Sequence, residues 1–233
     1  MPLPDLPATQ TAIIEMTNAF RAEQRLGGLQ RNATLALAAQ RYAEYLASTG
    51  RFAHDADGRS PADRISAAGY KHCSVAENLA LNQKSTGFET RELARSAVEG
   101  WKGSPPHRRA MLDPGVTEIG IGIAKAPDTD PKYISVQLFG RPLSMRYSFR
   151  IENAAQDAIA YSFSNKEHTL PPRAIVTIAS CQPGEILFPA ARPVSTFAAR
   201  QGGVYRALRD SAGVLRIEVN LAGAVEGVAP KTR

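Results

Sequence analysis

Apolar residues recur every three or four positions in four segments of roughly the first hundred residues. This period places one face of a helix in a core, so it predicts helices over residues 9–26, 33–49, 61–68 and 90–101. Asn32 and Ser60 stand where helix-capping residues are expected, and Gly50 and Gly69 follow as residues that end a helix. A further short helical segment is expected over residues 107–112, after two prolines.

Two later segments alternate between large apolar residues and small or polar ones, and therefore predict strands. In residues 118–124 the isoleucines share one face and glycines occupy the other, and residues 133–139 alternate in the same way. A shorter strand is expected over residues 75–81. Together these strands predict a small antiparallel sheet with helices packed over it.

The pattern changes after residue 142, where the helical period is lost and short alternating segments follow one another. They predict strands over residues 147–151, 159–163, 175–178, 185–188, 205–208 and 215–219. So many short strands are typical of a small β-sandwich or barrel. We therefore predict an α+β protein with a leader (residues 1–10), a first domain (11–142), an all-β, sandwich-like domain (146–223) and a tail (224–233).

With 233 residues, of which 43% are hydrophobic, the chain is long enough for two folded domains. No apolar run approaches the roughly 20 residues that a membrane-spanning helix needs. The first residues lack the basic and apolar regions of a secretory signal. This start fits a cytosolic protein or a mature chain that has been exported.

The net charge of +6 is uneven, because residues 146–233 hold 11 Lys and Arg against 7 Asp and Glu. Nine of those 11 are arginine, which favours planar anionic partners such as carboxylate or phosphate. A surface kept soluble by its charge explains the same excess. No nucleic-acid-binding motif and no long basic run is present, so no nucleic-acid partner is expected.

The two cysteines, Cys73 and Cys181, fall one in each expected domain, and neither lies in a redox or zinc-binding spacing. A disulfide between the domains would suit an exported protein. Two separate buried thiols fit the sequence equally well.

Residues able to carry chemistry gather in three short blocks. Residues 52–61 contain His54, residues 76–79 contain Glu77, and residues 101–108 contain Ser104 and His107. Histidine is scarce, with four in the chain, and two imidazoles beside a carboxylate are able to bind a divalent metal or a polar ligand. We expect folding to bring His54, Glu77 and His107 into one cleft that is open to solvent.

The order of these blocks resembles the CAP superfamily, which groups cysteine-rich secretory proteins, antigen 5 and plant pathogenesis-related proteins. The likeness is strongest to its short bacterial SCP-like domains and covers about residues 11–142, including Asn18, Arg21 and the segments 68–70, 117–122 and 136–140. It implies an α-β-α sandwich and an extracellular or periplasmic location. The C-terminal part resembles no known family.

The resemblance also implies a cleft tetrad of two histidines and two acidic residues. His54, Glu77 and His107 match three of its members, but Ser104 occupies the position of the second acid. One anionic oxygen is therefore missing. Any Zn²⁺ bound by His54 and His107, with or without Glu77, is expected to be weakly held and exchangeable.

Several roles stay open for the cleft residues. Glu77 could be a third metal ligand, the acceptor that fixes the tautomer of one histidine, or an acceptor of backbone N–H groups. Ser104, ahead of two prolines, is typical of a helix N-cap, and a nucleophile–base pair with His107 is the lesser alternative. Asn78 is expected to form a turn.

Three functions are compatible with these residues. The first, which we favour, is a non-enzymatic binding protein whose cleft holds a metal or a small polar or lipid ligand; the resemblance implies relatives that bind sterols and lipids. The second is a metal-dependent, peptidase-like hydrolase with Glu77 as its base. The third is recognition of the cell envelope or of lipid headgroups by the basic β-domain.

Overall fold

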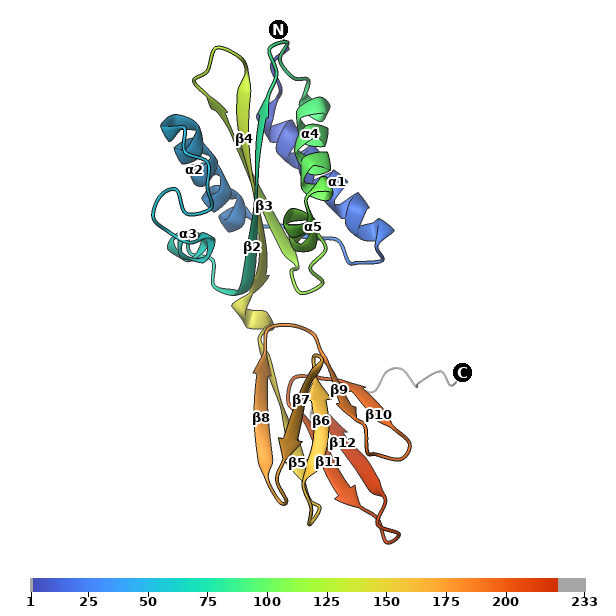
Figure 1. Cartoon of the computed structure of the whole chain (residues 1–233). Coiled ribbons are helices and arrows are strands. Elements are labelled where there is room, and N and C mark those ends of the chain that lie inside the picture. The colour runs from blue at the N-terminus through green and yellow to red at the C-terminus, as the bar shows by residue number, and fades with distance from the viewer. Residues whose placement is uncertain (1, 222–233) are drawn as a thin grey trace. The chain divides into compact units, whose positions relative to one another are not determined.

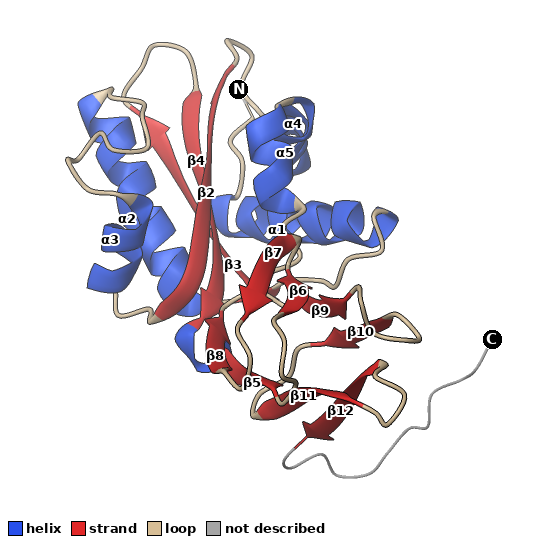
Figure 2. Cartoon of the chain, turned by 60° about the horizontal axis from the view of Figure 1, so that its bottom comes forward, coloured by secondary structure: helices blue, strands red, loops and turns tan. Residues whose placement is uncertain are grey.

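The computed structural model describes residues 2–221 of the protein (Figure 1). The chain divides into two compact units, one ending at Met145 and the other beginning at Arg146. In Figure 2 the helices belong to the first unit, and the second unit consists of strands and loops. The tail expected over residues 224–233 lies outside the described residues.

The helices of the first unit begin and end close to their predicted limits. Asn32 caps its helix by accepting hydrogen bonds from the backbone N–H groups of Thr34 and Leu35, and Gly50 ends it in the left-handed region, at φ 68°. The first helix starts earlier than its apolar period predicts, because Asp5 caps it through the N–H of Ala8. The helices are α1 (Leu6–Glu23), α2 (Ala33–Thr49), α3 (Pro61–Ala67), α4 (Thr90–Gly103) and α5 (Pro105–Met111).

A four-stranded sheet separates these helices into two layers. Its strands are β1 (Gln30–Arg31), β2 (His72–Gln83), β3 (Glu118–Ala126) and β4 (Lys132–Pro142), in the order β1-β3-β4-β2. Only the short β1 pairs in parallel, and β2 is longer at both ends than predicted. Helices α2 and α3 cover one face and α1, α4 and α5 the other (Figure 1). The predicted α-β-α sandwich is confirmed.

Helix α2 lies with its backbone directly on the glycines of β3. A Cβ atom at Gly120 or Gly122 would lie under 3.0 Å from backbone atoms of α2. The side-chain amide of Gln40 completes this contact, since it both donates to the carbonyl of Ile123 and accepts from its N–H, each at 3.0 Å. The alternation of isoleucine and glycine in this strand therefore places the isoleucines in the core shared with α1 and α4, and leaves room for α2 on the other face.

The second unit consists of two four-stranded sheets that share one apolar core. One sheet has the order β12-β11-β5-β8 and the other β10-β9-β6-β7. All six predicted strands are present, together with β7, whose residues are mostly exposed, and β10, in which partly buried and exposed residues alternate. The strands are β5 (Tyr147–Asn153), β6 (Ile159–Phe163), β7 (Lys166–Leu170), β8 (Ile175–Ser180), β9 (Glu185–Phe188), β10 (Ser195–Ala198), β11 (Gly203–Arg209) and β12 (Leu215–Leu221).

Two further findings concern the cysteines and the length of the helices. Within residues 2–221, no cysteine is a free thiol, so the alternative of two separate thiols is wrong. In the same part of the chain, no helix has the length and apolar character needed to cross a membrane.

The glycine contact predicts a large difference between two identical substitutions. Gly122→Ala pushes α2 away from the sheet and is expected to destabilise the first unit by about 2 kcal/mol or more. Gly100→Ala, in α4 with open space around it, is expected to stabilise by about 0.5–1 kcal/mol. Urea unfolding followed by the fluorescence of Trp101, the single tryptophan, measures both. Equal effects of the two substitutions would contradict the contact.

Candidate functional site

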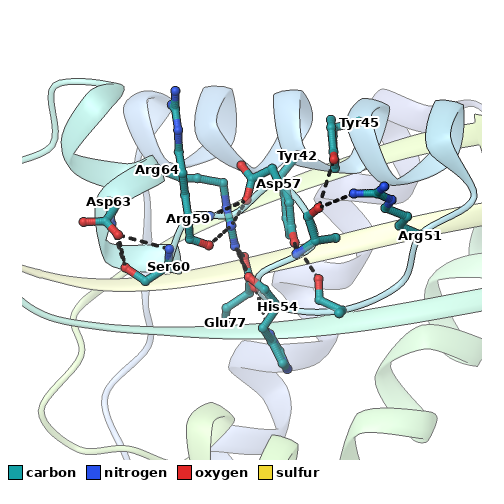
Figure 3. A network of polar contacts seen from close by, with 12 residues as sticks. Tyr42, Tyr45, Arg51, His54, Asp57, Arg59, Ser60, Asp63, Arg64 and Glu77 are labelled. Atoms are coloured by element: carbon teal, nitrogen blue, oxygen red, sulfur yellow. Dashed lines mark hydrogen bonds and ion pairs between the residues drawn. The ribbon is translucent and has the colours of Figure 1, made fainter.

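His54 and Glu77 are in direct contact. The ring Nδ1 of His54, in the loop between α2 and α3, lies 2.8 Å from Oε1 of Glu77 in β2. The side chain of His54 is 51% exposed, whereas that of Glu77 is 1% exposed. Figure 3 shows the imidazole extending past β2, on the side away from α2. The carboxylate thus orients the ring through Nδ1–H and leaves Nε2 available to a ligand.

Arg64, in α3, holds the carboxylate of Glu77 from the other side. Its Nη2 lies 2.8 and 3.1 Å from the two oxygens of Glu77 and also donates to the backbone carbonyl of His54 at 2.9 Å. Its Nη1 donates to Asp57 Oδ1 and to the carbonyl of Arg59, both at 2.8 Å. One guanidinium, with a side chain that is 7% exposed, therefore joins α3, the loop that carries His54, and strand β2 (Figure 3).

Helix α2 fixes the same loop through two tyrosines. The hydroxyl of Tyr42 donates to the carbonyl of Ala53 at 2.5 Å and accepts from the N–H of Ala56 at 3.1 Å. The hydroxyl of Tyr45 donates to the carbonyl of Ala56 at 2.9 Å. The guanidinium of Arg64 stacks on the ring of Tyr42, 3.4 Å from its centroid. The backbone on both sides of His54 is held in place by these contacts.

Two opposing effects act on the ionisation of Glu77. Burial raises the pKa of its carboxyl, while the hydrogen bond from His54 and the ion pair with Arg64 lower it. Because both oxygens already have partners, Glu77 fits the role of the acceptor that fixes the His54 tautomer. It does not fit the role of a metal ligand, nor that of an acceptor of backbone N–H groups.

His107 is in the first turn of α5, the short helix that follows two prolines. Its backbone carbonyl accepts a hydrogen bond from the side chain of Asn78 at 3.2 Å. Burial lowers the pKa of the His107 imidazole, and the charge of His54 lowers it further. This effect of His54 agrees with the predicted shared cleft of the two histidines, which stays a prediction.

Asn78 forms no turn, contrary to the prediction. It is buried within β2, 1% exposed, and its amide also donates to Gln137 in β4 at 2.9 Å. Gln137 in turn donates to the hydroxyl of Thr17 in α1 at 3.0 Å. This buried chain of hydrogen bonds connects α1, the sheet and the turn that carries His107. Arg21 holds the other end of α5 through the carbonyl of Met111, at 2.7 Å.

Ser104 occupies the N-cap position of α5, as its sequence context predicts, but its side chain makes no capping hydrogen bond. Within the described part of the chain, no hydrogen bond joins its hydroxyl to another residue. Neither a cap function nor a pair with His107 is therefore supported by a contact.

Comparison with known proteins places this geometry in a family. The model of the cysteine-rich secretory protein family, CAP, matches residues 14–139, more than half of the chain. The chain belongs to the CAP family. The match lies within the first unit, which is hereafter the CAP domain.

Two proteins of Bacillus subtilis are similar to the CAP domain in sequence. The uncharacterised protein YkwD is 29% identical over 120 residues, which is 51% of this chain and 44% of YkwD. The uncharacterised membrane protein YlbC is 27% identical over 116 residues, 49% of this chain and 31% of YlbC. The match thus spans less than half the length of either relative.

Among solved structures, an outer surface protein of Borrelia burgdorferi is similar in fold. The TM-score is 0.50 and the identity 24%, over 57% of this chain and 92% of the Borrelia protein. This likeness concerns the fold alone.

The side chains of the CAP domain do not form the zinc site with a full ligand set that the family tetrad implies. In residues 2–221, no group of three or more His, Cys, Asp or Glu side chains is arranged to hold a metal ion. Both oxygens of Glu77 are engaged by Arg64 and His54, and Ser104 replaces the second acid. The residues do not fit a zinc centre with three or four protein ligands. Two imidazoles remain, so only weak, exchangeable binding of Zn²⁺ stays a prediction.

Arg64 is expected to be essential for the stability of the CAP domain. Arg64→Met leaves the buried carboxylate of Glu77 without its cation, which costs about 3–5 kcal/mol in urea unfolding. Arg95→Met, on an exposed part of α4, is the control and is expected to change stability by less than about 0.5 kcal/mol.

The pH dependence of Arg64→Met distinguishes lost charge from lost packing. Without the cation, the pKa of Glu77 rises further above its unfolded value, so the folded state binds a proton that the unfolded state releases. The stability deficit relative to the wild type is therefore expected to shrink as the pH falls through that pKa. A deficit that is constant with pH would show that packing alone was lost.

The proximity of the two imidazoles is testable by NMR titration. The pKa of His107 is expected below the ordinary value of 6.5, and to rise towards it in His54→Ala, because the neighbouring positive charge is removed. His72→Ala is the control and leaves the pKa of His107 unchanged, since the imidazole of His72 bonds to Ser66 instead. An unchanged His107 titration in His54→Ala would place the rings in separate regions.

Proposed function

We propose that the CAP domain binds a small polar ligand between the imidazoles of His54 and His107, without catalysing a reaction on it. The observation that carries this proposal is the half-exposed ring of His54, oriented by the fully buried carboxylate of Glu77. With Nδ1–H donated to Glu77, the Nε2 lone pair accepts a hydrogen bond from a hydroxyl or amide group of the ligand. Arg64 favours the ionised form of the carboxylate and holds it in position.

The same geometry gives little support to hydrolysis with Glu77 as base. A general base must reach the proton that it removes, directly or through one water. The side chain of Glu77 is 1% exposed, and its oxygens already accept from Arg64 and His54. A ligand in the cleft therefore meets the imidazole and not the carboxylate, which favours binding over catalysis.

We place this binding outside the cytoplasm. The Borrelia burgdorferi protein that shares the fold is named as an outer surface protein, and YlbC as a membrane protein. The absence of a free thiol within residues 2–221 fits an oxidising compartment. These observations support export of a CAP-domain protein.

The arginines of the second unit give less support to an electrostatic function. Four of them are paired with carboxylates of the same unit: Arg150 with Glu152, Arg206 with Glu218, Arg209 with Asp157 and Arg216 with Asp210. Their charges are thus compensated within the molecule. No contact within the described residues favours the cell-envelope ligand expected for this unit.

Zn²⁺ serves as a probe of the imidazole pair. Thermal unfolding of the full chain with ZnCl₂ is expected to show a small, saturable rise in Tm, because weak binding to the folded state stabilises it. His54→Ala and His107→Ala each remove one of two ligands and are expected to abolish the rise. A peptide-library digest is expected to show no cleavage, with or without ZnCl₂.

His72→Ala is the matched control for the metal titration and should keep the wild-type response. If all three variants respond as the wild type does, the two imidazoles share no site. If peptides are cleaved, and His54→Ala abolishes the cleavage, the cleft is catalytic and the proposal is wrong.

A further inference from the structure

A cavity of about 150 Å³ lies between α2 and α3, separate from the imidazole pair. Arg41, Tyr42 and Tyr45 line it from α2, Arg64 lines it from α3, and Asp57 and Arg59 line it from the loop before α3. Three alanines complete the wall, and neither His54 nor His107 belongs to it. The cavity therefore combines three guanidinium groups with one carboxylate.

The carboxylate that lines the cavity, that of Asp57, already accepts hydrogen bonds from protein groups. Asp57 Oδ1 accepts hydrogen bonds from Arg64 Nη1 at 2.8 Å and from the backbone N–H of Arg59 at 3.1 Å. Arg64 is balanced twice, by Asp57 and by Glu77. The uncompensated positive charge of the cavity therefore comes from Arg41 and Arg59.

These two guanidinium groups have no partner in the described part of the chain. No hydrogen bond or ion pair joins the side chain of Arg41 or of Arg59 to another residue within 2–221, and both residues are exposed. The positive charge of Arg59 adds to the lowering of the Asp63 pKa, after the hydrogen bonds from Ser60, whose hydroxyl lies 2.6 Å from Asp63. Both arginines line the same cavity, so their guanidinium groups are available to one ligand.

The aromatic wall of the cavity is rigid. The rings of Tyr42 and Tyr45 are nearly parallel, at 6°, with centroids 6.2 Å apart. Both hydroxyls are bound to backbone carbonyls of the loop, so neither is free to turn into the cavity. The ring of Tyr42 is covered by Arg64, so a ligand meets the partly exposed Tyr45 and guanidinium donors.

We infer that this cavity binds a small oxyanion, a phosphate or carboxylate group, between Arg41 and Arg59. A guanidinium group donates two parallel N–H bonds to two oxygens of one anion. This fork fits both planar carboxylate and tetrahedral phosphate. A compact volume admits the anionic group and little more. The inference is independent of the function proposed for His54 and His107.

Calorimetric titration of the full chain with inorganic phosphate tests the inference, at an ionic strength kept constant with NaCl so that screening is equal throughout. Saturable binding is expected, and Arg41→Gln and Arg59→Gln are each expected to weaken it about tenfold. Arg95→Gln, which removes the same charge from an exposed position of α4, is expected to bind as the wild type does.

A second titration, with acetate, separates the two anion classes. Binding of phosphate or of acetate with the expected variant pattern supports the site and identifies its class. Absence of saturable binding for both anions overturns the inference, as does equal weakening by Arg95→Gln. His54→Ala is expected to keep phosphate binding, and loss of binding there would place the anion at the imidazole pair instead.

Discussion

The contact between the backbone of α2 and the glycines of β3 is the constraint on which the CAP domain depends. With no side chain at Gly120 or Gly122, the helix approaches the sheet as closely as main-chain atoms permit. Its position fixes Tyr42, Tyr42 fixes the following loop and supports Arg64, and Arg64 fixes Glu77. Through this series of contacts, the orientation of His54 depends on the two glycines of β3.

The polar network beside this contact stabilises two buried charged groups, the carboxylate of Glu77 and the guanidinium of Arg64. A carboxylate that is almost completely buried is unfavourable unless its oxygens are satisfied, and Arg64 and His54 together satisfy both oxygens of Glu77. Arg64 is buried too, and it is compensated by two carboxylates, two carbonyls and an aromatic ring. The network holds because every buried charge has a partner, which also makes each member costly to remove.

Sequence reasoning anticipated the elements better than the contacts. The helix ends followed from short local signals, such as the Ser60–Asp63 capping box, and the isoleucine–glycine alternation placed β3. Strand β7 escaped prediction because its residues are exposed on both faces, and the turn before it uses Ser164 and Asn165 at positive φ. The turn predicted at Asn78 was wrong because no neighbouring residue indicates that its amide bonds to Gln137, which is 59 positions away in the sequence. Local patterns specify ends and faces, whereas partners distant in sequence depend on the whole fold.

The site residues illustrate the same limit. Direct contact between His54 and Glu77 agrees with a shared cleft, but no pattern in the sequence singled out Arg64, which bonds to Glu77 and to the backbone of His54. Its spacing of seven residues from Asp57, across a capped helix start, was the one usable signal.

The segments that carry the two imidazoles belong to different layers of the sandwich. His54 is carried by the layer of α2 and α3, whereas His107 is carried by α5, on the opposite face of the sheet. Strand β2, at the edge of the sheet, contacts both residues: Glu77 bonds to the ring of His54, and Asn78 bonds to the backbone carbonyl of His107. Two neighbouring residues of one edge strand thus hold segments from opposite faces of the sheet, so a change in this strand acts on both histidines at once.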